Sequence, residues 1–200
     1  MIVLVTLVTG MTVTAGVLRL LEPGPVAPLT GITLQSVEHD YSSAGRLFDT
    51  NGSSREWRAI VIHDSGRLAD SARSLNHRHK QQGRAGLGYH FVINNGTHNK
   101  RDGAVEVGYR WQHQHPGDYF APGPDADWFH EHAISICMIG DADRRSLTRS
   151  QLRELVWLVQ KLQSGYDIPA EAVYVQVGNG RESLFPDGWF RDQLLARRVP

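Results

Sequence analysis

Beyond its first fifty residues, the chain alternates short apolar runs with longer polar stretches. Four of the runs are rich in β-branched or aromatic residues, which predicts β-strands. They are residues 58–62, 88–93, 133–139 and 173–177. The first of them has no polar alternation, a pattern typical of a strand buried on both faces. Asp102-Gly103 then leads into residues 104–107, which predicts a hairpin-like continuation of the second run.

The polar stretches between these runs carry the signals of helices. Residues 71–82 form one such stretch. Thr148 and Gln151 have the spacing of a capping box, and apolar residues then recur at helical spacing as far as Gly165. Residues 189–197 predict a closing helix. Strands interspersed with helices predict a sheet with helices packed on it, in an α/β or mixed α+β domain.

The N-terminal part of the chain differs from the rest. Residues 1–18 carry no charged side chain, and a helix of that length spans about 27 Å, just under the ~30 Å core of a bilayer. We therefore expect residues 1–22 to be a signal peptide or a membrane anchor, with export as the consequence. Three prolines lie close together in residues 23–54, which predicts a linker with a possible strand at 31–38. Residues 55–200 form the predicted domain.

Composition excludes several classes of protein. Lys and Arg together number 21, as do Asp and Glu, so the formal net charge is zero. A nucleic-acid binder carries a basic excess, so we expect no nucleic-acid partner. Cys137 is the single cysteine, which rules out an intramolecular disulfide. A chain of 200 residues is long enough to bury a core without one.

His63 is the first candidate for chemistry, because it stands at the end of a buried strand, where side chains face a cleft. Asp64 and Ser65 follow it directly. Adjacent strand residues point to opposite faces, so these three side chains cannot form a Ser-His-Asp relay. The chain has neither a G-x-S-x-G elbow nor a phosphate-binding glycine loop.

Six segments between Trp57 and Phe190 occur together in the order of a known family. They are AIVIHDS (59–65), GLGYHFVI (86–93), DGAVEVGYRW (102–111), ISICMIGD (134–141), TRSQ (148–151) and FPDGWF (185–190). In this order they resemble the zinc N-acetylmuramoyl-L-alanine amidases of the phage-lysozyme and peptidoglycan-recognition-protein type. The resemblance implies a central mixed sheet flanked by helices, with a groove that holds zinc.

The resemblance also implies an activity and a set of site residues. The family cleaves the amide between N-acetylmuramic acid and L-alanine, so the expected partner is peptidoglycan or a muropeptide and the expected location faces the cell wall, in the periplasm or at a membrane. His63 matches the first zinc ligand, and Tyr89 the tyrosine at the reaction centre. Ser183 stands where the family often has a threonine or lysine. The groove would be lined by His63, Tyr89, Arg110, Trp111 and Tyr119.

Two expected zinc ligands are missing. Val177 stands at the position of the second ligand, with Gln176 as the alternative if the loop differs by one residue, and Phe185 stands at the third. His132 is the last histidine of the chain, so no later imidazole can replace them. A catalytic zinc takes three protein ligands, and apolar residues fill an empty metal pocket at little cost. We therefore expect recognition of peptidoglycan by a domain with no cofactor and impaired catalysis.

Two alternatives stay open. Three His-x-His pairs exist, at 77/79, 113/115 and 130/132. The first falls in the polar helical stretch and is interpreted as a solvated face. Either of the other two could join His63 in a rebuilt zinc site, because such a pair on a strand projects to one face, and this would make the domain an active amidase. The second alternative is a scaffold whose groove binds a protein partner.

Overall fold

The computed structural model describes residues 47–51, 53–118, 125–178 and 183–196 of the chain. They belong to one compact unit, Arg46–Pro200. The predicted leader or anchor at 1–22, most of the linker and the possible strand at 31–38 lie outside the described residues. Among the helices of the described part, none combines the length and apolar character needed to cross a membrane.

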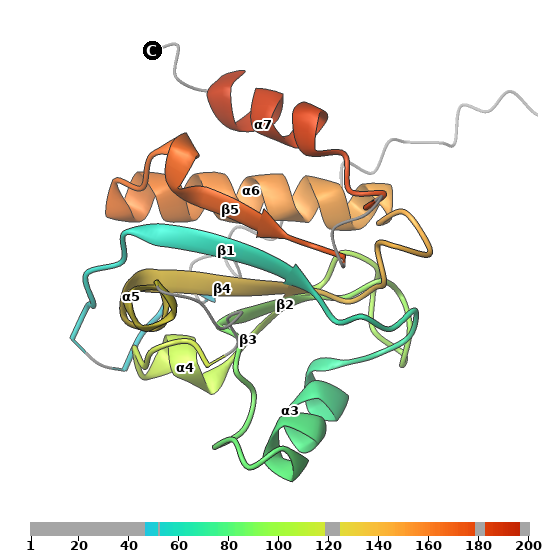
Figure 1. Ribbon diagram of the computed structural model, residues 1–200, viewed down its shortest axis with the longest axis horizontal. Helices are drawn as coiled ribbons and strands as arrows, with labels where there is room; N and C mark the ends of the chain where they lie inside the picture. The colour runs from blue at the N-terminus through green and yellow to red at the C-terminus, as the bar shows by residue number, and fades with distance from the viewer. Residues whose placement is uncertain (1–46, 52, 119–124, 179–182, 197–200) are drawn as a thin grey trace, which may run out of the picture. The chain divides into compact units, whose positions relative to one another are not determined.

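The core of the unit is a five-stranded mixed sheet in the order β3-β2-β4-β1-β5 (Figure 1). Its strands are β1 (Ala59–Asp64), β2 (Phe91–Ile93), β3 (Val105–Val107), β4 (Ala133–Met138) and β5 (Val173–Gln176). Four of them are parallel, and β3 pairs antiparallel with β2. The predicted sheet and hairpin are thus confirmed. The four parallel strands β1, β2, β4 and β5 therefore have their carboxyl ends at the same edge of the sheet, which we call the carboxyl edge.

Strand β2 is shorter than the predicted run 88–93 because a side chain replaces part of the ladder. The backbone N–H of Ser135 donates to Nδ1 of His90 at 2.9 Å instead of to a strand carbonyl. The same Nδ1 atom of His90 also lies 2.9 Å from the hydroxyl oxygen of Ser135. Regular pairing starts only at Phe91, opposite Ile136.

Within the described residues, five helices and one short 3-10 turn accompany the sheet. They are α3 (Ala72–Gln81), α4 (Tyr109–Gln112), α5 (Ala126–His132), α6 (Arg149–Tyr166), η1 (Ala170–Ala172) and α7 (Asp187–Leu195). The predictions of α3, α6 and the closing helix are confirmed. Helices α4 and α5 were not predicted, because α4 has a single turn and α5 buries none of its side chains, so neither has an apolar period.

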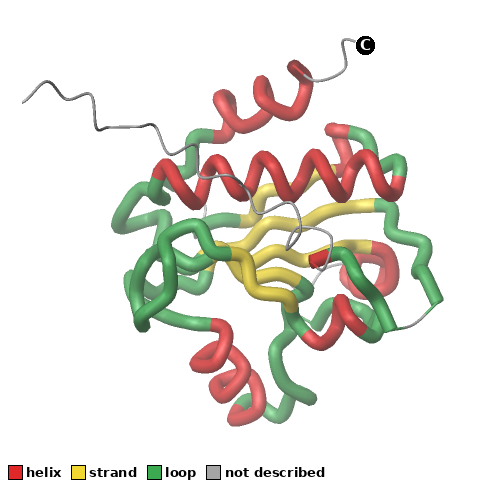
Figure 2. Tube along the Cα trace, turned by 180° about the vertical axis from the view of Figure 1, so that it is seen from behind, coloured by secondary structure: helices red, strands yellow, loops and turns green. Residues whose placement is uncertain are grey.

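The two faces of the sheet are covered by different helices. On one face, α6 lies across the strands (Figure 2) and packs on large side chains. These include Ile60, Ile62, Ile134, Ile136 and Met138. On the other face, α3 packs through Leu75 on Val92 and Cys137, and α5 packs through Phe129 on small strand residues. We call these the α6 face and the α3 face.

The start of α6 is fixed to the carboxyl edge of the sheet. Thr148 and Gln151 form the capping box that their spacing predicted. The side-chain amide of Gln151 also donates to the carbonyls of Ile93 and Ile139, at 3.2 and 2.8 Å. One buried side chain thus connects the helix to the ends of β2 and β4.

Candidate functional site

His63 is the second-last residue of β1 and lies on the α3 face, at the carboxyl edge of the sheet. Its partners in register are Cys137 on β4 and Gln176 on β5, so the three residues share that face. The His63 side chain is only 5% exposed. Burial lowers its pKa from 6.5 to about 4, so the imidazole is neutral at pH 7.

Asp64 follows His63 and points away from it. Its Oδ2 accepts the backbone N–H of Ala142 at 2.9 Å, and it also accepts from the backbone of Gly178. Burial raises the pKa of the carboxyl, and these backbone hydrogen bonds partly offset the effect. The expectation that neighbouring residues do not form a relay agrees with this geometry, because Asp64 is occupied by the backbone of two loops.

Tyr89, the second residue that the resemblance singled out, lies beside His63. Its ring centroid is 5.6 Å from that of His63 and 5.6 Å from that of His79. Its side chain is also hydrogen bonded to Cys137. Gly108 backs this segment, since a Cβ there would lie 2.4 Å from the Tyr89 carbonyl oxygen. Only glycine lets the backbone segments around residues 89 and 108 approach so closely.

His79 is a residue of this cluster that the sequence reasoning misplaced. The prediction of a solvated helix face is wrong for His79, which is buried, whereas its neighbour in the pair, His77, is exposed. The physical reason is helical spacing, since His79 lies four residues after Leu75 and on the same buried face. Nδ1 of His79 accepts the backbone N–H of Gly88 at 3.0 Å, and burial, with Arg84 and Arg78 nearby, lowers its pKa to about 4.

His90 is a second buried histidine that the sequence did not single out. Its two ring nitrogens lie 2.9 Å from the Ser135 hydroxyl and 2.9 Å from the His115 carbonyl oxygen. Burial lowers its pKa to about 4. Its ring packs edge-on against Trp57, with centroids 4.8 Å apart. His90 therefore holds β2, β4 and the loop after α4 together in its neutral form.

Zinc does not fit the described residues. No three His, Cys, Asp or Glu side chains within them are grouped so that they could hold a metal ion. Cys137 lies beside His63, but it is fully buried and its side chain is hydrogen bonded to Tyr89. Together with His63 it would supply only two of the three protein ligands of a catalytic zinc. The other register neighbour of His63 is Gln176, whose amide is not among the usual zinc ligands.

The two apolar residues at the expected ligand positions lie in the core. Val177 and Phe185 are both buried in the cluster of the α6 face. The ring of Phe185 packs edge-on against Phe190, with centroids 5.4 Å apart. Since Gln176 shares the α3 face with His63, the β5 residue beside that imidazole is Gln176, whereas Val177 packs with the apolar cluster.

The other histidine pairs do not complete a metal site in the described residues. His130 and His132 lie on α5 rather than on a strand, so their side chains do not project to one side. Nδ1 of His130 lies 2.8 Å from the Gly117 carbonyl oxygen. The rings of His113 and His115 are 5.7 Å apart, and no third ligand joins them within the described residues.

The remaining groove residues have structural partners. Arg110 is buried and donates to the carbonyls of Leu87 and Pro116, at 2.9 and 2.6 Å, and also contacts Asp118. Trp111 is fully buried in the cluster of the α6 face, so it presents no surface to a ligand. Both were expected at a strand end but form part of α4, where Trp111 turns inward.

Ser183 and Tyr119 complete the predicted set. Ser183 accepts the backbone N–H of Phe185 through its hydroxyl at 3.3 Å, so it caps the turn before α7. Tyr119 lies outside the described residues. The structure therefore brings together His63 and Tyr89 from the predicted set, and adds His79 and Cys137 to them.

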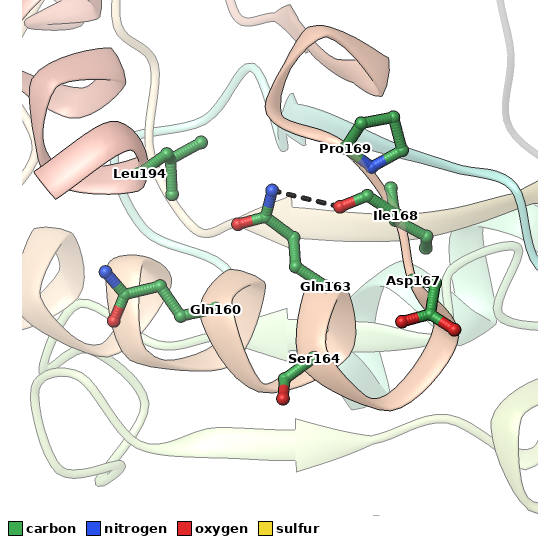
Figure 3. Close-up of a pocket in the computed structure, with 7 residues that line it drawn as sticks. All are labelled: Gln160, Gln163, Ser164, Asp167, Ile168, Pro169 and Leu194. Carbon is green, nitrogen blue, oxygen red and sulfur yellow. Dashed lines mark hydrogen bonds between the residues drawn. The ribbon is translucent and has the colours of Figure 1, made fainter. Parts of the chain in front are cut away.

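A cavity of about 380 Å³ lies between the end of α6 and α7, away from this cluster (Figure 3). Gln163 lines it and donates to the carbonyl of Ile168 at 3.2 Å. Asp167 is the single ionisable side chain of its lining. This composition offers no pair of groups for acid–base or metal chemistry.

Comparison with known proteins decides the family. The model of the N-acetylmuramoyl-L-alanine amidase family (Amidase_2) matches residues 53–182. The chain belongs to this family. The endolysin of Escherichia phage T7 is 30% identical to this amidase-family chain over 117 residues, which cover 54% of the chain and 68% of the endolysin. The function of the chain is therefore related to peptidoglycan, as an amidase or in recognition.

Solved structures show the same fold. The N-acetylmuramoyl-L-alanine amidase LysC from Clostridium intestinale superposes with a TM-score of 0.56 at 23% identity, covering 70% of this chain and 87% of LysC. The endolysin amidase LysCS from the same organism has a TM-score of 0.54 at 23% identity, over 70% of this chain and 85% of LysCS. The mixed sheet flanked by helices, which the resemblance implied, is thus the fold of the amidase family.

Proposed function

We propose that this amidase-family domain recognises peptidoglycan or a muropeptide and that its zinc-dependent hydrolysis is lost. The observation that carries the proposal is the set of side chains around His63. Its register neighbours are a thiol and an amide, Val177 and Phe185 are buried in the core, and the described residues contain no group of three potential metal ligands. A single imidazole does not supply the three protein ligands of a catalytic zinc.

The carboxyl edge of the sheet is the proposed binding surface. Ligands of open α/β sheets bind outside the carboxyl ends of the strands. The parallel strands place His63 and the exposed Gln176 at that edge. A neutral imidazole offers one hydrogen-bond donor and one acceptor, and an amide side chain offers both as well. These groups match the amide-rich stem of a muropeptide without any change of charge.

Metal content and hydrolysis test the loss of catalysis. The purified full chain, incubated with excess zinc and dialysed, should contain far less than one zinc ion per chain and release no stem peptide from peptidoglycan. The N-acetylmuramoyl-L-alanine amidase LysC, treated in parallel, serves as the positive control for peptide release. Near-stoichiometric zinc together with release that EDTA abolishes would falsify the proposal.

Sedimentation with insoluble peptidoglycan tests recognition. The wild-type chain should sediment with the polymer, and the variant Gln176→Ala should bind about fivefold more weakly because an exposed polar contact is lost. Gln112→Ala changes an exposed glutamine on α4 and is the matched control. If the wild-type chain stays in the supernatant at low salt, the domain does not recognise the polymer, and a scaffold for a protein partner becomes the better explanation.

An active amidase with atypical ligands is the second candidate. The observation in its favour is the contact between His63 and Tyr89, since both match positions of the reaction centre by resemblance. On this reading zinc would be the cofactor. The zinc and EDTA measurements above decide between the two candidates, because recognition alone requires no metal.

We also propose that residues 1–22 direct export, as a signal peptide or an anchor, and that residues 23–54 link them to the amidase domain. The protein then faces the cell wall in the periplasm or at the membrane. Cell fractionation with N-terminal sequencing of the mature chain tests this. Recovery in the cytosolic fraction with an intact N-terminus would contradict it.

A further inference from the structure

A second candidate site lies on the outer side of α3. A cavity of about 530 Å³ separates this helix from the loop that follows β1. Its lining consists of Arg67, Arg73, Ser74, His77, Arg78 and Gln81. Three of these side chains are guanidinium groups, and none is acidic. Since the whole chain has no net charge, this local excess of positive charge is a feature of the pocket and not of the composition.

Both walls of the pocket have a fixed backbone. On the loop side, the N–H of Arg67 donates to the carbonyl of Gly140 at 3.0 Å, and the Ser65 hydroxyl donates to the same carbonyl at 3.1 Å. On the helix side, Ser71 caps α3 by accepting the N–H of Ser74 at 3.2 Å. The arginines therefore project from two anchored supports, which lowers the entropic cost of bringing them onto one ligand.

The charges of the pocket are only partly compensated. Arg78 pairs with the buried carboxylate of Asp70 at 2.6 Å, which also fixes its position. For Arg67 and Arg73, the described residues contain no acidic partner within ion-pair distance. Two positive charges thus face the pocket without a counter-charge from the described part of the chain.

The position of Arg73 makes the imbalance larger. It lies in the first turn of α3, which contains no acidic residue. The start of a helix carries partial positive charge, so an arginine there is unfavourable and an anion is favourable. The buried carboxylate of Asp70, just before the N-cap, pairs with Arg78 and not with Arg73, so the positive charge of Arg73 adds to that of the helix start.

We propose that this pocket binds a phosphate group, either free or as a monoester. A phosphate monoester carries about −1.5 to −2 charges at pH 7, which matches the two uncompensated arginines, and guanidinium groups bind its oxygens in pairs. A single carboxylate would neutralise only one of the two. The proposal goes beyond the recognition of peptidoglycan and does not depend on it, because α3 presents the pocket on the side opposite its buried residues, Leu75 and His79.

Calorimetric titration of the full chain tests the proposal, with inorganic phosphate, glycerol phosphate and acetate at one constant ionic strength. Both phosphates should bind, and acetate should bind about tenfold more weakly or not at all. Equal affinity for inorganic and glycerol phosphate identifies the phosphate group itself as the ligand. Preference for the ester identifies an esterified source, and preference for the inorganic ion a free one; all three results support the site.

Variants locate the binding. Arg67→Ala/Arg73→Ala should weaken phosphate binding about tenfold or more, since two charge-assisted contacts are lost. The Arg67→Gln/Arg73→Gln variant removes both charges but keeps a polar side chain at each exposed position. It should show the same loss, which assigns the effect to the charges rather than to the loss of side-chain bulk. Arg149→Ala/Arg153→Ala removes two exposed arginines from α6 and should leave binding unchanged. The absence of phosphate binding, equal binding of acetate, or equal losses in the α6 control would overturn the proposal.

Discussion

The two faces of the sheet are built from the same strands but differ in the size and polarity of their side chains. On β4, Ile134, Ile136 and Met138 face α6, whereas Ala133, Ser135 and Cys137 face α3 and α5. The same division runs along β1, where Ile60 and Ile62 lie on the α6 face and His63 lies on the α3 face. The α6 face is a tight apolar layer. The α3 face has small residues that leave room for the rings of His63, Tyr89, His79 and His90.

This difference teaches that burial alone does not separate core from site in this domain. Strands β2 and β4 are buried on both faces, and β1 nearly so. The large apolar side chains that stabilise the domain nevertheless gather on one face, and the histidines and Tyr89 gather on the other. We therefore expect substitutions on the α6 face to change stability strongly and substitutions on the α3 face to change ligand binding or pH dependence.

The largest effect on stability is expected from Ile136→Ala on the α6 face. Removing this fully buried side chain should lower the free energy of unfolding by about 2–5 kcal/mol, because lost transfer energy and a cavity add together. The matched substitution Cys137→Ala, one residue on but on the α3 face, should cost about 1 kcal/mol, since it removes a single sulfur atom. Urea denaturation measures both losses. Equal losses of unfolding free energy for the two variants would contradict the difference between the two faces.

The buried histidines of the α3 face predict a loss of stability in acid. In the folded protein the pKa of His90 is about 4, compared with 6.5 for an unperturbed imidazole. The unfolded chain therefore binds the proton first, and the free energy of unfolding falls as the pH drops from 6.5 to about 4. For His90 alone the loss is about 3 kcal/mol over that range. His63 and His79 act in the same direction.

The variant His90→Gln tests this pH dependence. It should be less stable than the wild type at pH 7, because packing and hydrogen bonds change, but should lose less stability between pH 7 and pH 4.5. Asp64, whose pKa is raised, titrates in both proteins, so its contribution cancels in the comparison. Denaturation curves at several pH values supply the slopes, and parallel slopes would contradict the assignment.

The connection between α6 and the ends of β2 and β4 predicts an intermediate effect. Gln151→Ala removes the hydrogen bonds to the carbonyls of Ile93 and Ile139 and half of the capping box. We expect a loss of about 2 kcal/mol, because buried carbonyls are left without donors. Gln160→Ala, on the same helix, removes one partly buried bond to Gln193 and should cost about half as much. A larger cost at Gln160 would show that the strand ends do not depend on α6.

The smallest effect on stability is expected from Tyr89→Phe. The substitution keeps the ring contacts with His63 and His79 and removes the hydroxyl that is hydrogen bonded to Cys137. The free energy of unfolding should change by about 1 kcal/mol or less. Thermal unfolding measures the change. If instead the free energy of unfolding falls by several kcal/mol, Tyr89 stabilises the domain as strongly as a core residue does. The distinction between the two faces then fails at this position.

The sequence predicted the parts of the fold that have a strong local signal. The capping box at Thr148 and Gln151 fixed the start of α6, and the apolar period fixed its length. Three of the four predicted strands agree with the structure to within two residues at either end, and β2 is shorter only because the ring of His90 occupies the ladder. Helix α5 was missed because none of its residues is buried, so its sequence has no period to detect.

The candidate site was predicted less completely, because side-chain direction depends on the whole fold. His63 and Tyr89 were found by resemblance, and the structure places their rings in contact. Trp111 follows a strand-like run, yet α4 turns it into the core, which no local pattern indicates. His79 was detectable in principle, since it lies four residues after Leu75, but the basic residues around it hid that spacing.

Gly108 has a consequence for how relatives of this domain are compared. Any side chain at this position would collide with the carbonyl oxygen of Tyr89, which stands 2.4 Å from where the first carbon would be. A homologous sequence with a larger amino acid there must carry its tyrosine on a displaced segment. This single position therefore reports, without coordinates, whether a related protein can keep the aromatic ring against its strand-end imidazole.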